Sequence, residues 1–325
     1  MGEYAFELRL CATLETQTAG VVARQVGAGV ANAARRVLDI VVIEPGPAFE
    51  RRCQLSANAI PPAAIACDVG VGRWRQWPRD VDVSSAAAEH VLDRAVRAGF
   101  FEQERRGGKT YVRQTVRYPA WIGHVTAIEN KPDLRSPGEM IDQLRYDVCL
   151  GLVDEVILAT ESYVTRAHLN RLPDAVGVWR VQSSDDAVSI EVIREPTPLD
   201  RCGWGIEIRS TTPTSTEIRS ISPQAKRSAR IRLAERAYGK GWRPTFPGCA
   251  RVRPHTVAET PCLPHCDWKD RVVDPGGCGP ACDGHDPADP PVIEDSKARD
   301  RRTGWRACPV GFATEQADLT MFDST

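Results

Sequence analysis

The sequence predicts an α/β protein in which a mixed sheet is flanked by helices. Three observations support this fold class. Residues 3–16 have helical apolar spacing, residues 35–46 form a β-branched run that ends in Pro-Gly, and helix-like and strand-like segments alternate between residues 125 and 181. Such alternation favours helices packed on the faces of a sheet, with ligands gathering at the ends of its strands.

The composition is that of an ordinary globular protein. The chain has 325 residues, of which 42% are hydrophobic and 26% are charged, and its formal net charge is -1 at pH 7. This near-neutral balance provides no global field for nucleic acid, so a polyanion site has to be local. The charged N-terminus lacks the apolar core of a signal peptide, and no apolar run approaches the roughly 20 residues that span a bilayer. We therefore expect a cytoplasmic protein with no membrane partner.

The first two elements each carry a noteworthy carboxylate. Residues 3–16 are predicted to form an amphipathic helix with Glu7 on its polar face. Residues 35–46 are predicted to form a strand with Asp39 in its middle. A buried carboxylate costs several kcal/mol unless it is paired, hydrogen-bonded or bound to a metal. Asp39 therefore needs a partner of one of these kinds.

A third strand carries the stretch Glu-Asn-Lys before Pro132. Residues two apart on a strand share a face, so Glu129 and Lys131 emerge together. The following helix carries Gln143. A Glu and a Lys in this arrangement commonly form a surface salt bridge that adds little stability. The alternative is a charged site at the end of the strand.

Residues 79–118 predict a helix followed by a β-hairpin that turns at Gly107 and Gly108, which resembles the second half of a winged helix. Arg105, Arg106 and Lys109 surround the turn. These three cations either contact DNA phosphates or belong to a solvated turn.

The charged residues described so far occur in a recognisable order along the chain. The members are Glu7, Asp39, Glu129, Lys131, Gln143 and the predicted strand 154–160. This order resembles the PD-(D/E)XK nuclease superfamily, with its restriction-endonuclease-like mixed sheet, and the whole chain is similar to an uncharacterised archaeal protein family of unknown function. The superfamily resemblance covers residues 3–181, with residues 46–118 as an insertion, and implies a nuclease-like core over residues 1–181.

The resemblance implies hydrolysis of DNA phosphodiesters with the help of Mg²⁺. Asp39 and Glu129 would hold the cation, because Mg²⁺ is commonly bound by one or two carboxylates, and Glu7 would assist them. Lys131 would orient the attacking water and offset phosphate charge, and Gln143 would position water or phosphate. Two alternatives stay open: a DNA-binding regulator that has lost catalysis on the same fold, and a structural or interaction protein. The sequence also leaves a homo-oligomer open.

Residues 182–243 are predicted to form a β-rich segment followed by a basic helix. Between residues 223 and 243 there are seven basic residues and one acidic residue. Arg230 and Arg236 are candidate phosphate contacts in this helix, and a merely solvated basic face is the alternative.

Residues 244–285 are rich in cysteine and poor in apolar residues. The pairs Cys262 with Cys266 and Cys278 with Cys282 predict a structural zinc site, for which Cys249 is an alternative ligand. An iron-sulfur cluster is the rival, and free thiols are the third alternative. Residues 286–325 are predicted to be a mostly disordered tail.

Overall fold

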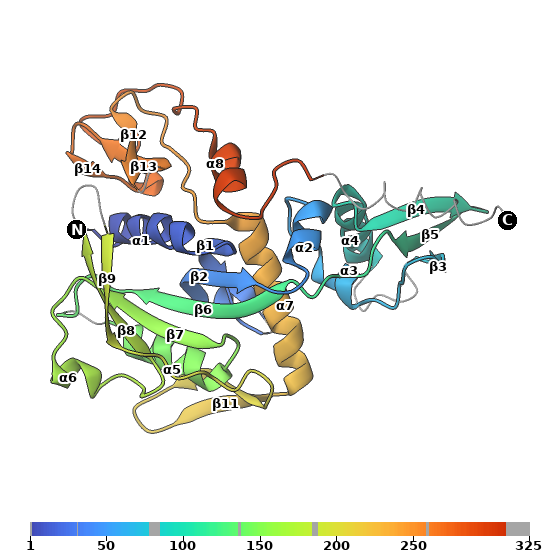
Figure 1. Ribbon diagram of the computed structural model, residues 1–325, viewed down its shortest axis with the longest axis horizontal. Coiled ribbons are helices and arrows are strands. Elements are labelled where there is room, and N and C mark those ends of the chain that lie inside the picture. The colour runs from blue at the N-terminus through green and yellow to red at the C-terminus, as the bar shows by residue number, and fades with distance from the viewer. Residues whose placement is uncertain are drawn as a thin grey trace.

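The fold is built around one six-stranded mixed sheet (Figure 1). The computed structural model describes residues 2–30, 32–77, 85–135, 138–183, 188–257 and 260–309. The strands of the sheet are β1 (Val21–Gly27), β2 (Val37–Pro45), β6 (Ile122–Asn130), β7 (Glu155–Thr160), β8 (Gly177–Ser183) and β9 (Val188–Arg194), and this is also their spatial order. β6, β7 and β8 run parallel, whereas the other neighbours are antiparallel.

Helices cover both faces of this sheet. α1 (Glu3–Gln17) packs on one face, where Phe6 meets Ile40 and Ile128 in one core cluster. α5 (Met140–Leu150) and α7 (Pro223–Lys240) belong to the larger cluster on the other face. Because side chains alternate between the faces of a strand, each central strand feeds both clusters. The predicted mixed sheet flanked by helices is therefore confirmed.

α1 differs from the predicted amphipathic helix, because it is buried on nearly every side. The sheet covers one side, and the C-terminal strands pack against another. Glu7 and Glu15 are consequently buried, and each is paired with an arginine. Burial of a carboxylate is tolerated when it is paired and hydrogen-bonded in this way.

The insertion forms a module with a core of its own. Its elements are α2 (Phe49–Leu55), α3 (Pro62–Ala66), β3 (Arg75–Gln76), α4 (Ser85–Arg97), β4 (Phe101–Arg106) and β5 (Lys109–Gln114), and the strand order is β3-β5-β4. Gly107 and Gly108 turn the hairpin with positive φ angles, which glycine adopts without steric cost. The predicted helix and hairpin are present, and the likeness to a winged helix stays a prediction.

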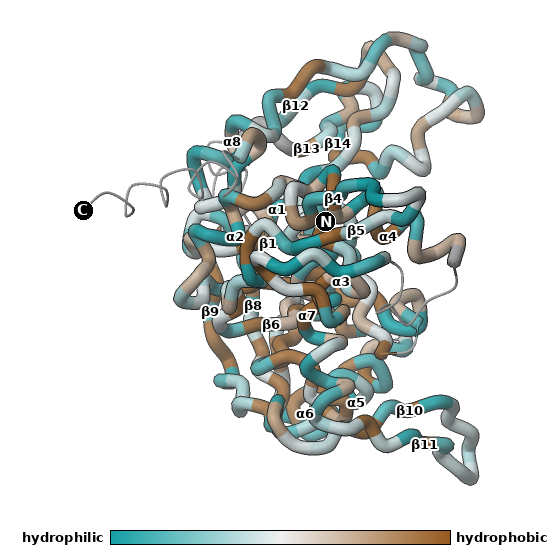
Figure 2. Tube along the Cα trace, turned by 90° about the vertical axis from the view of Figure 1, so that its right-hand side faces the viewer, coloured by the Kyte–Doolittle hydropathy of each residue, from teal (hydrophilic) through white to brown (hydrophobic). Residues whose placement is uncertain are grey.

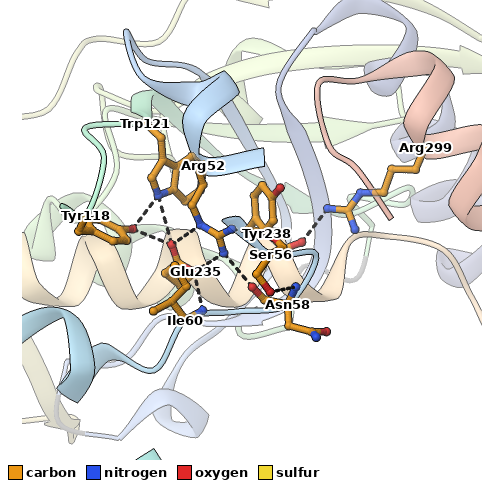
Figure 3. A network of polar contacts seen from close by, with 9 residues as sticks. All are labelled: Arg52, Ser56, Asn58, Ile60, Tyr118, Trp121, Glu235, Tyr238 and Arg299. Carbon is orange, nitrogen blue, oxygen red and sulfur yellow. Dashed lines mark hydrogen bonds and ion pairs between the residues drawn. The ribbon is translucent and has the colours of Figure 1, made fainter. Parts of the chain in front are cut away.

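A buried ion pair attaches the insertion to α7 (Figure 3). The guanidinium of Arg52 on α2 donates to both carboxylate oxygens of Glu235 on α7, at 2.9 and 2.7 Å. Tyr118 and the backbone N–H of Ile60 donate to the same carboxylate. Since Arg52 and Glu235 are 0% and 1% exposed, these hydrogen bonds satisfy charges that water does not reach.

α7 packs in the core of the molecule, so only part of its predicted basic face is exposed. Its cationic side chains largely bond to backbone carbonyls: Lys226 donates to Asp200 O, Arg232 to Val30 O and Lys240 to Gln25 O. These basic residues thus satisfy carbonyls of two loops and of β1 that pack around the helix, in agreement with the rule that buried polar groups find partners.

The smaller elements surround this core. They are η1 (Ala33–Arg35), α6 (Arg166–Leu169), β10 (Gly205–Thr211), β11 (Thr216–Ile221), β12 (Val252–Val257), β13 (Thr260–Cys266), β14 (Arg271–Val272), η2 (Pro275–Gly277) and α8 (Asp295–Arg302). The β10–β11 hairpin projects from the core and is mostly hydrophilic (Figure 2). In the part of the chain that is described, no helix is both long and apolar enough to cross a membrane.

The predicted tail is ordered over part of its length, which corrects the prediction of disorder for residues 286–309. α8 lies in this region, where Arg299 donates to the carbonyl of Tyr238 at 2.7 Å and Trp305 is buried in the main core. One buried aromatic ring and one buried guanidinium anchor a segment whose composition is polar. Residues 310–325 lie outside the described part of the chain.

The Arg52–Glu235 pair predicts a large stability effect. Arg52→Met leaves Glu235 buried without a countercharge, so the free energy of unfolding should fall by about 3–5 kcal/mol in denaturant titrations. The matched control is Arg97→Ala, which breaks an exposed pair with Asp93 and should change stability by less than about 1 kcal/mol. Equal, small effects of both substitutions would show that the buried pair does not anchor the insertion.

Candidate functional site

A cavity of about 790 Å³ lies where α1, the ends of β2 and β6, and the start of α5 meet. The structure brings all of the sequence-predicted catalytic residues to this cavity: Glu7, Asp39, Glu129, Lys131 and Gln143. They come from segments far apart in the sequence. Asp274 of the C-terminal segment also lines the cavity, so that segment borders the site.

Gln25 shapes the floor of the site around Asp39. Gln25 and Asp39 lie opposite each other on β1 and β2 but are not paired in the sheet, whereas the residues on either side are. Gln25 has a φ of 52°, an uncommon conformation for a residue other than glycine. Its side-chain amide nitrogen lies 3.2 Å from both carboxylate oxygens of Glu7 and 3.4 Å from Asp39 Oδ1. The backbone N–H of Asn130 donates to Asp39 Oδ2 at 2.9 Å. Asp39 is thus held by two neutral donors.

Glu129 is held by an arginine that the sequence reading did not single out. Arg36 Nη2 lies 2.7 Å from Glu129 Oε2 and 2.6 Å from Asp147 Oδ2, and all three side chains are buried. Arg36 Nε also donates to Asp147 Oδ1 at 2.9 Å. These charge-assisted bonds fix Glu129 of β6 relative to α5, which carries Asp147.

Burial raises the pKa of the three candidate carboxylates. For Glu129 the pKa rises to about 7, first because of burial and then because the negative charge of Asp39 is close. The pKa of Asp39 and that of Glu7 are also raised, in both cases mainly by burial. Their charged forms are therefore costly in this site, as is typical of carboxyls that are withdrawn from water and lie near each other.

Lys131 and Glu129 do not form the surface salt bridge that their spacing allows. Lys131 Nζ lies 3.4 Å from Glu3 Oε1, whereas the partner of Glu129 is Arg36. Lys131 is half-buried and lies just beyond the end of β6, where it faces the cavity. Its ammonium group can therefore act on a group bound in the cavity.

Among the residues that the sequence did not predict, Arg24, Gln25, Arg36 and Asp147 bond to the candidate carboxylates or to their partners. Arg24 pairs with Glu7 at 2.8 Å. Asp147 follows Gln143 by one helical turn, a spacing that could have indicated a shared side of the helix. The sequence gives no comparable signal for Gln25, because its importance comes from its backbone conformation.

The predicted DNA-binding residues are separated in space. Arg105, Arg106 and Lys109 lie at the tip of the β4–β5 hairpin, which projects from the side of the molecule opposite the N-terminus (Figure 1). Arg106 is paired with Glu104 and lies 5.6 Å from the ring centre of Trp74. These three side chains are exposed, and their role in DNA binding stays a prediction.

The two predicted residues of α7 have different surroundings. Arg230 is largely buried, pairs with Asp154 and donates to the carbonyls of Leu152 and Gly123. Its guanidinium is thus engaged within the protein, and its role as a phosphate contact stays a prediction. Arg236 makes no such bonds in the described part of the chain and lines a second cavity.

Cysteines gather in the C-terminal segment. Cys249, Cys266 and Cys278 belong to one small cluster, and the backbone N–H of Asp286 approaches Cys249 Sγ at 3.5 Å. Burial and the neighbouring thiols of Cys249, Cys266 and Cys282 raise the pKa of Cys278. The side chain of Cys262 lies outside the described residues. Within the described part, no group of three or more His, Cys, Asp or Glu side chains is arranged to hold a metal ion.

The fold and site define an α/β protein with a carboxylate-rich cavity at the end of a mixed sheet. Residues 21–287 match a family of unknown function, DUF5787, and the chain belongs to this family. No curated protein and no solved structure matches the chain. The resemblance to the PD-(D/E)XK nucleases therefore stays a prediction from the order of the charged residues.

The raised pKa of Glu129 predicts a specific pH dependence of stability. In the unfolded chain Glu129 loses its proton near pH 4.5, whereas in the folded chain it keeps the proton until about pH 7. Its contribution to the free energy of unfolding is therefore present at low pH and is lost as the pH rises from about 4.5 through about 7. Denaturant titrations should show that the free energy of unfolding of wild type falls relative to that of Glu129→Gln as the pH rises over this range.

The matched control is Glu191→Gln, because Glu191 is an exposed carboxylate on β9 of the same sheet. Its stability difference from wild type should stay nearly constant between pH 5 and 8. A constant difference for Glu129→Gln as well would contradict the proposed environment of Glu129.

Proposed function

We propose that this protein is a divalent-cation-dependent hydrolase of DNA phosphodiesters. The observation that carries the proposal is the convergence of Glu7, Asp39, Glu129, Lys131 and Gln143 on one cavity. Three carboxyls with raised pKa values lie beside a lysine there. Perturbed carboxyls in a cavity are typical of functional sites, although structural ion-pair networks also produce them.

The chemistry of the donors fits a hard cation such as Mg²⁺. Asp39 and Glu129 provide carboxylate oxygens, and a cation of this kind needs only one or two of them because it keeps several waters. When bound, it would stabilise charge on the phosphoryl oxygens and lower the pKa of a water nucleophile. Asp39 lacks a directly bonded cation among the described residues, since its hydrogen-bond donors are the neutral Gln25 and Asn130.

The other residues have roles that follow from their positions. Lys131, just beyond the end of β6, would pair with a phosphate oxygen and orient the attacking water. Its positive charge would offset the negative charge of the phosphate, which a neutral donor cannot do. Gln143 on α5 would hold a water or a phosphate oxygen through its amide. Glu7, which Arg24 already neutralises, would act from the edge of the site by holding Gln25 in place.

One observation favours the second candidate, an inactive DNA-binding protein on the same fold. Arg36 already neutralises Glu129, and its guanidinium serves Asp147 at the same time. If Arg36 keeps both oxygens of Glu129 from the cation, the site is a structural ion-pair network. Only Glu129 Oε2 is bonded to Arg36 in the structure, however, and the catalytic proposal uses the other oxygen, Oε1.

Cation binding and cleavage can be separated by two substitutions. Asp39→Asn should abolish both the rise in melting temperature on adding Mg²⁺ or Mn²⁺ and the cleavage of duplex, single-stranded and branched DNA, because it removes a cation ligand. Lys131→Ala should keep the cation-dependent rise but reduce cleavage by about a hundredfold or more, because Lys131 acts on water and phosphate.

Glu191→Gln serves again as the control and should behave as wild type in both assays. The proposal fails if neither cation raises the melting temperature of wild type while Lys131→Ala melts well below it. That pattern would mean that Lys131 stabilises the fold through Glu3 and that the cavity is structural.

We also propose that the C-terminal segment binds one zinc ion through thiolates, with Cys249, Cys266, Cys278 and Cys282 as ligands. The gathering of these cysteines supports the proposal, and so does the small apolar core of the segment, which holds only a few buried residues. Bound zinc stabilises segments of this kind in place of hydrophobic burial. The side chains would have to move to reach tetrahedral geometry around the ion.

Purified protein should therefore contain about one zinc per chain by elemental analysis, and Cys266→Ser or Cys278→Ser should lose it together with thermal stability. Cys149→Ser, which changes an exposed thiol on α5, should keep both. Iron together with visible absorption would identify an iron-sulfur cluster instead. Metal-free protein that melts at the same temperature as protein supplied with zinc would contradict metal binding altogether.

A further inference from the structure

A second cavity, of about 710 Å³, lies beside the carboxylate site. It is formed by α4 of the insertion, the last turn of α7 and the end of β1. Its charged and titratable lining residues are His90, Asp93, Arg94, Arg97, Arg236 and Lys240, and we call it the basic groove. Asp93 is its one carboxylate and is paired with Arg97, so the other cations leave the groove with excess positive charge.

Arg236 is the most informative residue of the basic groove. It is half-buried, and its Nε is shielded from solvent without a hydrogen-bond partner in the described part of the chain. Burial lowers the pKa of Arg236, and the nearby charge of Arg232 lowers it further. A half-buried guanidinium with no carboxylate partner among the described residues is stabilised when an anion reaches it, because partial burial weakens its hydration.

Arg94 lines the same groove as Arg236 but comes from a different element. It is exposed on α4, and no ion pair or hydrogen bond of its side chain occurs among the described residues. The groove therefore presents cations from two elements that are far apart in the sequence. An extended polyanion can contact both walls.

The basic groove and the carboxylate cavity are adjacent. Gln25 lines both of them, and Lys240 of the groove donates to the carbonyl of Gln25 at 2.6 Å. Arg24 and Glu7 of the carboxylate cavity both influence the pKa of Lys240, which burial lowers. A chain of phosphates could thus pass from one cavity to the other along Gln25.

We infer that the basic groove binds the phosphate backbone of the DNA strand whose scissile phosphate enters the carboxylate cavity. This inference rests on the proposed function, because it takes the cavity as the place of cleavage. Arg94 and Arg236 contact phosphates, and Gln25 lies between the basic groove and the carboxylates. The exposed hairpin tip at Arg105 is not required for DNA binding in the basic groove.

Equilibrium binding without divalent cations tests the inference. Anisotropy of labelled single-stranded and duplex oligonucleotides in EDTA should show weaker binding for Arg94→Gln and Arg236→Gln, with the slope of log K against log salt reduced by about 0.7 to 1 for each lost contact. Arg227→Gln removes an exposed cation of α7 outside the groove and should leave affinity and slope unchanged.

Unchanged slopes for both groove variants would overturn the inference, and so would an equal loss for Arg227→Gln. Arg94 lies on the exposed face of α4, so its variant remains informative even if Arg236→Gln unfolds. This test of DNA binding can be distinguished from the test of DNA cleavage. Groove-dependent binding by a wild type that cleaves nothing would support the groove and reject the nuclease, whereas Asp39-dependent cleavage with unchanged groove variants would do the reverse.

Discussion

The bridge that Arg36 makes between Glu129 and Asp147 is the constraint on which the candidate site depends. It joins β6 to α5 and balances part of a cluster of buried acids. Without it, Glu129 and Asp147 would be buried without a countercharge, at a cost of several kcal/mol. With it, Glu129 is fixed close to Asp39, whose own donors are neutral. In the proposed function, the remaining negative charge in the cavity would make a bound cation favourable.

The basic residues of α7 show that a charged residue in the sequence does not reveal whether it bonds within the protein or binds a ligand. Lys226 and Arg230 of α7 bond to loop carbonyls, so much of the apparent basic surface is structural. Glu235, the one acid of that helix, anchors the insertion through Arg52. Arg236 lies on the same helix without a partner among the described residues, and it is the position where a ligand is most expected. Arg236 differs from Lys226 and Arg230 because different segments pack around each side chain.

The convergence of Asp39, Glu129 and Lys131 was expected from the resemblance of their order to the PD-(D/E)XK nucleases, and the structure brings them to one cavity. The sequence alone was sufficient to predict the mixed sheet, because strand periodicity and the alternation of elements are visible in it. It was not sufficient for Arg36, whose partners are distant in sequence, or for Gln25, whose role depends on a positive φ. The burial of nearly all sides of α1 and the order in residues 286–309 follow from packing against other segments. Local composition does not contain that information.

The central claim is that Asp39 and Glu129 share a divalent cation. Anomalous diffraction from crystals grown with Mn²⁺ would test it most directly, since the scattering of manganese locates the ion independently of the protein atoms. The account predicts an anomalous peak within about 2.0–2.6 Å of one oxygen of each carboxylate, with Arg36 still bonded to Glu129 Oε2. An empty cavity at saturating Mn²⁺, with Glu129 and Asp39 unchanged, would contradict the account.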